Sequence, residues 1–129
     1  SYENNDNSIA QNNAVKESIY RKFFFTGKDC EKKIKVIFED SKKLNINGFI
    51  KKFDLIFIDG NHTYSYVKND SEKAFKMIKK NGFIFWHDYI LFKMSTSGVV
   101  KYIKSISNKY KIFHIKNTNM CFLKYTNDD

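Results

Sequence analysis

The chain of 129 residues is 42% hydrophobic and 17% aromatic, which is enough for one globular domain with a packed core. Its formal charge of +9 comes from scattered lysines, with Arg21 the only arginine. This composition argues against a protein that recognises nucleic acid through arginine contacts to phosphates and bases. No apolar run approaches the ~18 residues of a membrane span, and the first residues lack the basic start and apolar middle of a signal peptide, so we expect a cytoplasmic protein without membrane contacts.

The amino-terminal third is expected to contain one helix and one strand. Residues 1–13 are a polar, asparagine-rich lead-in without periodicity. Apolar residues at helical spacing predict an amphipathic helix over residues 14–25, which Gly27 ends. The β-branched run IKVIF, residues 34–38, predicts a strand followed by Asp40 and Ser41. Residues 42–52 then form a linking segment with a turn.

The stretch FDLIFIDGNHTY, residues 53–64, predicts a buried strand at residues 55–58 and a polar loop after it. A short, continuous apolar run bounded by turn residues is typical of a strand in a parallel sheet. An amphipathic pattern over residues 65–80 predicts the next helix. A third buried strand is predicted at residues 83–86, and it ends in His87 and Asp88.

The last third is expected to contain one helix and a hairpin. Apolar spacing predicts a helix over residues 97–110, and two strands are predicted at residues 112–115 and 120–125. The four residues between them are few enough for an antiparallel turn. Strands that alternate with helices predict an α/β fold with a mainly parallel sheet, closed at one edge by this carboxyl-terminal hairpin.

Three of the predicted strands end in acids, namely Asp40, Asp59 and Asp88. The carboxyl ends of parallel strands share one edge of a sheet, where ligands bind in open α/β folds. His62 and His87 lie in the same loops. Because carboxylates and imidazoles are costly to gather without a compensating cation or polar ligand, this edge is the candidate site.

Each of these residues also has a structural interpretation. Asp59 and Gly60 form a common turn pair. A structural role fits each histidine as well as a functional one. His62 could cap or bridge the following helix, and His87 could be a neutral residue beside Trp86. The two cysteines, Cys30 and Cys121, are far apart and lack metal-ligand spacing, so they are expected to be reduced thiols.

Taken together, the run from residue 53 to residue 89 resembles the core of class I S-adenosylmethionine-dependent methyltransferases, specifically methyltransferase family 24. That group has a strand ending in I-D-G-x-H, a tyrosine two residues later, an aspartate in the next helix, and a glycine-led strand ending in H-D. In this sequence these positions are Asp59, Gly60, His62, Tyr64, Asp70, Gly82, His87 and Asp88. The resemblance extends over about residues 20–125.

The resemblance implies a Rossmann-like fold with helices on both faces of the sheet, and S-adenosylmethionine bound at its carboxyl edge. Asp40, Ser41, Asp59 and Gly60 would contact this cofactor. Asp59 and Asp88 would hold Mg²⁺ or another divalent metal, with His62 or His87 as a base or a further ligand. The implied reaction is O-methylation of a small molecule or sugar, with metal assistance.

The resemblance also implies missing parts. The family's first strand, its glycine-rich cofactor turn and its second strand have no counterpart among the five glycines of this chain. We therefore expect one partial methyltransferase domain, the carboxyl-terminal part, whose activity alone is doubtful. An incomplete sheet exposes strand edges, which favours homo-oligomers. The alternative function is a non-catalytic basic α/β module for a nucleic-acid or protein partner, which steeply salt-dependent binding would reveal.

Overall fold

The computed structural model describes residues 23–126. The chain divides into two compact units, residues 1–39 and 40–129, and each is described by itself. Within the described part, no helix combines the length and the apolar character that a membrane crossing requires. The polar lead-in predicted at residues 1–13, and most of the helix predicted at 14–25, lie outside the described residues.

The described part of the first unit contains turns, one short 3-10 helix, Glu31–Lys33, and an extended or irregular segment after it. Phe23 and Phe25, which the sequence assigned to a helix, lie in or beside a turn and stack on each other with ring centroids 4.9 Å apart. The backbone N–H of Gly27 donates to the Glu31 carboxylate at 2.7 Å. Local hydrogen bonds therefore organise this segment.

The strand predicted at residues 34–38 is not formed, so this prediction was wrong. The segment has extended or irregular backbone, its residues are exposed, and it pairs with none of the described strands. A β-branched run becomes a strand only when a neighbour pairs with its N–H and C=O groups. Asp40 consequently does not follow a strand.

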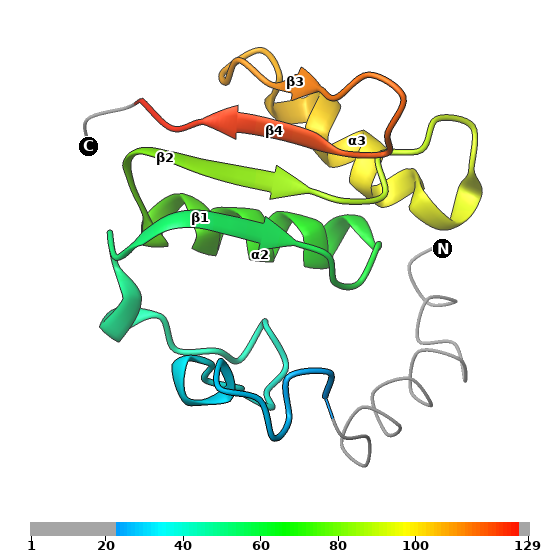
Figure 1. The fold of residues 1–129 in the computed structure, drawn as a ribbon. Coiled ribbons are helices and arrows are strands. Elements are labelled where there is room, and N and C mark those ends of the chain that lie inside the picture. The colour runs from blue at the N-terminus through cyan, green and yellow to red at the C-terminus, as the bar shows by residue number, and fades with distance from the viewer. Residues whose placement is uncertain (1–22, 127–129) are drawn as a thin grey trace. The chain divides into compact units, whose positions relative to one another are not determined.

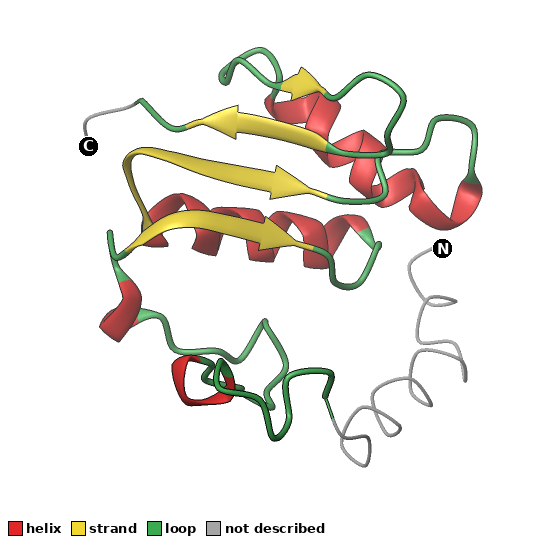
Figure 2. Ribbon diagram, viewed as in Figure 1, coloured by secondary structure: helices red, strands yellow, loops and turns green. Residues whose placement is uncertain are grey.

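The second unit is built on a four-stranded sheet in the order β1-β2-β4-β3 (Figure 1). Its strands are β1 (Phe53–Ile58), β2 (Ile78–Trp86), β3 (Phe113–His114) and β4 (Cys121–Lys124). The helices are α2 (Tyr64–Met77) and α3 (Ser97–Ile106), with 3-10 helices at Asn47–Phe49 and Met94–Thr96 (Figure 2). The α/β architecture is therefore confirmed.

The described sheet is mixed. β1 and β2 are parallel, joined through α2, whereas the β2–β4 and β3–β4 pairs are antiparallel. The predicted hairpin is confirmed, with the Ile115 N–H donating to the Met120 carbonyl at 2.9 Å. Because the hairpin inserts β4 next to β2, two of the three pairings are antiparallel, and a mainly parallel sheet is not seen in the described residues.

Both helices end earlier than the sequence predicts. Residues 78–80 belong to β2, because Ile78 pairs with Phe53 and the Lys79 ammonium contacts the Asp54 carboxylate at 2.9 Å. α3 ends at Ile106, and the Ser107 hydroxyl donates to the Lys104 carbonyl at 2.8 Å. Such side-chain bonds compete with the helical ladder.

Helices cover one face of the described sheet, with α2 and α3 both behind it in Figure 1. That face supplies the buried core residues Ile84, Trp86 and Leu123. The other face presents exposed side chains, namely Phe53, Leu55, Phe57, Phe83 and Phe113. The expected helices on both faces are thus not found within residues 40–126, where α2 and α3 are the only α-helices.

A buried polar chain ties α2 to the end of β2. The Trp86 indole Nε1 donates to the Ser71 hydroxyl at 2.9 Å, and that hydroxyl donates to the Val67 carbonyl at 2.6 Å. Nearby, burial raises the pKa of Tyr102 to about 12 and that of the Cys121 thiol to about 11. Both groups therefore stay protonated at neutral pH inside the core.

Replacing Ser71 with alanine is expected to destabilise the fold. The indole N–H of Trp86 would lose its acceptor inside the core, which costs about 1–3 kcal/mol of unfolding free energy. Urea unfolding measures this loss. Ser105→Ala is the control, because that hydroxyl bonds the Tyr102 carbonyl of its own helix at the surface. Equal stability of the two variants would contradict the role given to Ser71.

Candidate functional site

The predicted site lies where the parallel strands β1 and β2 end. Ile58, the last residue of β1, pairs with Trp86, the last residue of β2. Asp59 and His87 therefore leave the sheet side by side, and the His87 N–H donates to the Ile58 carbonyl at 3.0 Å. The expectation that Asp40, Asp59 and Asp88 lie at one edge of the sheet is confirmed for Asp59 and Asp88, but it was wrong for Asp40, which follows no described strand.

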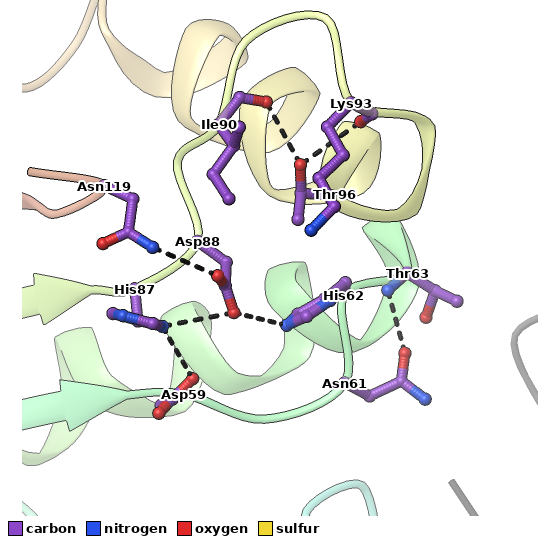
Figure 3. A network of polar contacts seen from close by, with 10 residues as sticks. All are labelled: Asp59, Asn61, His62, Thr63, His87, Asp88, Ile90, Lys93, Thr96 and Asn119. Atoms are coloured by element: carbon purple, nitrogen blue, oxygen red, sulfur yellow. Dashed lines mark hydrogen bonds and ion pairs between the residues drawn. The ribbon is translucent and has the colours of Figure 1, made fainter. Parts of the chain in front are cut away.

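Four side chains form one polar cluster there (Figure 3). The His62 Nε2 lies 2.8 Å from the Asp88 carboxylate, and the His87 Nδ1 lies 3.2 Å from both the Asp59 and the Asp88 carboxylates. The Asp88 side chain is 19% exposed and that of Asp59 is 48% exposed. The cluster is thus open to solvent at Asp59 and more enclosed around Asp88.

Asp88 has a left-handed backbone, with φ of 59°. This conformation is uncommon for residues with a side chain, although aspartate and asparagine tolerate it better than most. Backbone strain of this kind persists where the surroundings fix it, often at functional sites. Here it accompanies a carboxylate that contacts both histidines.

The loop before α2 sets the position of His62. The Asn61 side chain accepts a hydrogen bond from the Thr63 N–H at 2.8 Å, which forms an Asx turn. α3 packs closely against this loop at Gly98, where an added Cβ would lie 2.8 Å from the Thr63 carbonyl carbon and even closer to His62 O and Tyr64 N. Only glycine allows that approach.

The donor set fits a divalent cation. Ligand atoms of Asp59, His62 and Asp88 all lie within 4.8 Å of one another. The His87 Nδ1 is buried and makes no hydrogen bond, although it lies 3.2 Å from both carboxylates. Carboxylate oxygens suit Mg²⁺ and Mn²⁺, and imidazoles suit several transition metals. A small pocket lined by both strand ends and the Asp59–His62 loop adjoins these groups.

Asn119 is a further member of the site that the sequence analysis missed. Its side-chain amide donates to the Asp88 carboxylate at 3.4 Å (Figure 3). Its backbone carbonyl accepts a hydrogen bond from the Tyr89 N–H at 2.9 Å. It belongs to the β3–β4 turn, 31 residues after Asp88. Its position in a polar turn gave no signal of this contact.

Asp40 and Ser41 are not part of the cluster. Among the described residues, the group whose ligand atoms lie close enough together to hold one metal ion contains Asp59, His62 and Asp88 but not Asp40. The Asp40 carboxylate instead accepts the Lys42 N–H at 2.9 Å and the Tyr66 hydroxyl at 3.2 Å. The Lys42 N–H, and less strongly the Tyr66 hydroxyl, hold the pKa of Asp40 below its usual value.

The pKa of Tyr66 shifts in the direction opposite to that of Asp40. Partial burial and the Asp40 carboxylate raise the pKa of the Tyr66 hydroxyl. Gly60, the fourth predicted cofactor contact, lies in the loop after β1, and a Cβ built there would meet only the Asp70 carboxylate, at 3.5 Å. The four residues predicted to bind the cofactor thus lie on two loops, one before β1 and one after it.

A family model described as a methyltransferase domain matches residues 3–89, more than half of the chain. The chain belongs to this family. The resemblance to family 24 is therefore confirmed, and the match includes the four residues of the polar cluster. A search of the curated proteins found no match. That this methyltransferase domain is only the carboxyl-terminal part of a domain stays a prediction.

Proposed function

We propose that this protein is an S-adenosylmethionine-dependent O-methyltransferase whose acceptor is a small-molecule or sugar hydroxyl. The observation that carries the proposal is the pair of carboxylates, Asp59 and Asp88, gathered with two imidazoles at the ends of parallel strands. Membership of a methyltransferase family supports methyl transfer as the general reaction. The geometry adds a reason to expect a metal and a hydroxyl acceptor.

Asp59 and Asp88 would hold a divalent metal, and His87 Nδ1, which lies 3.2 Å from both carboxylates, would be a further ligand. Such an ion, when bound, lowers the pKa of a coordinated hydroxyl. S-adenosylmethionine would supply the methyl group as a sulfonium, and transfer to oxygen yields the methyl ether, S-adenosylhomocysteine and a proton. The chain's own contribution is to align the acceptor oxygen with that methyl group.

His62 is the base in this proposal. Asp88 contacts its Nε2, which favours the tautomer with the proton on that nitrogen and leaves Nδ1 to take the proton of the acceptor hydroxyl. Asp40 and Ser41 on one loop, and Asp59 and Gly60 on the other, would hold the cofactor. The described cysteines are free, in keeping with the proposed cytoplasmic setting.

Calorimetric titration with S-adenosylmethionine, with and without Mg²⁺, tests this function. We expect binding that Mg²⁺ strengthens, because the cofactor would bind beside the acids at this edge of the sheet. A parallel titration with adenosine triphosphate controls for attraction of any polyanion to the basic chain. The proposal fails if S-adenosylmethionine does not bind under either condition.

A further inference from the structure

Three backbone carbonyls of the turn after Asp40 converge on one ammonium group. The Lys73 Nζ donates to the carbonyls of Ser41, Lys42 and Leu44, at 3.1 Å for Lys42 and 2.9 Å for Leu44. Lys73 is only partly exposed and lies in α2, about 30 residues further along the chain. One side chain thereby satisfies acceptors that would otherwise need water or a neighbouring strand.

Other side chains of α2 hold the same turn. The Tyr66 hydroxyl donates to Asp40 at 3.2 Å, and the Lys42 ammonium reaches the Ser65 hydroxyl at 3.1 Å while lying 4.0 Å from the centre of the Tyr66 ring. Tyr66 and Lys73 are seven residues apart, which places them on the same face of the helix. Since residues 40–44 belong to no described strand, side chains of α2 take the place of a β-ladder there.

α2 also adjoins the loop that carries Asp59 and Gly60. The helix begins at Tyr64, directly after that loop, and the Asp70 carboxylate lies beside Gly60. One helix therefore borders both loops that carry the proposed cofactor contacts. We propose that Lys73 is a positioning residue, whose ammonium fixes the turn of Asp40 and Ser41 relative to α2 and so completes the cofactor site; this inference rests on the proposed function.

The chemistry of the contact makes the role of Lys73 specific. Hydrogen bonds from a charged donor are stronger than neutral ones, and removing the donor leaves its acceptors unsatisfied. Methionine at position 73 keeps the aliphatic stem but loses every donor. Arginine keeps charge and donors with a different shape. The two variants therefore separate loss of the hydrogen bonds from loss of packing.

The experiment measures two properties of each variant, amide hydrogen exchange at residues 42–44 and calorimetric affinity for S-adenosylhomocysteine. We expect Lys73→Met to speed exchange in that turn and to weaken binding about tenfold, and Lys73→Arg to restore part of both. Lys76→Met is the matched control, because this lysine is an exposed residue of the same helix. It is expected to behave like the unchanged protein.

The outcomes distinguish this inference from the function on which it rests. If the unchanged protein binds S-adenosylhomocysteine and Lys73→Met binds it equally well, the positioning role is overturned while the function stands. Unchanged exchange at residues 42–44 in Lys73→Met also overturns it. No binding by the unchanged protein rejects the proposed function, and the positioning role falls with it.

Discussion

Asp88→Asn is expected to lower the methyl-transfer rate about a thousandfold, because Asp88 is both a metal ligand and the partner of the base His62 in the proposed function. The substitution removes the charge that faces both imidazoles, yet asparagine has nearly the same shape and tolerates the left-handed backbone of residue 88. The fold should therefore survive. Initial rates measured over a range of Mg²⁺ concentrations check this result, with thermal unfolding to verify folding.

Asp54→Asn is the matched control for this change. Asp54 is an acid of the same sheet, but it lies at the opposite end of β1 and pairs with Lys79 at the surface. Surface pairs contribute little to stability, so its loss should leave the rate within about twofold of the unchanged protein. A rate in Asp88→Asn equal to that of the control would refute the assignment of Asp88 to the metal.

The centre of the site could be predicted from the sequence because it depends on local patterns. Two apolar runs separated by an amphipathic helix predict a parallel pair of strands, and a parallel pair brings the residues after each strand together. Asp59, His87 and Asp88 follow from that reasoning alone. The structure has the register that this reasoning requires, because Ile58 at the end of β1 pairs with Trp86 at the end of β2.

The periphery of the site depends on contacts between distant residues, which no local pattern encodes. Residues 34–38 have the composition of a strand, but composition does not say whether a partner is present. Asn119 reaches Asp88 only because the hairpin places β4 beside β2. Lys73 resembles the other lysines on the polar side of α2, and only the fold shows that carbonyls converge on it.

Gly98→Ala is expected to reduce both stability and activity, although alanine is normally the better helix residue by about 1 kcal/mol. Gly98 lies in the first turn of α3, and the atoms its Cβ would meet are backbone atoms of residues 62–64. Backbone cannot move aside as a flexible side chain does. Overpacking of this kind costs about 2 kcal/mol, so the sign of the usual glycine-to-alanine effect should be reversed.

The same clash moves His62, which connects stability with the site. α3 would have to shift away from the loop, or the loop away from Asp88, and the 2.8 Å contact of His62 with Asp88 would lengthen. Urea unfolding and initial rates measure the two effects. Gly48→Ala is the control, because a Cβ there meets nothing within 4 Å. If Gly98→Ala matched that control in both measurements, the close packing of α3 could not be what holds His62 in place.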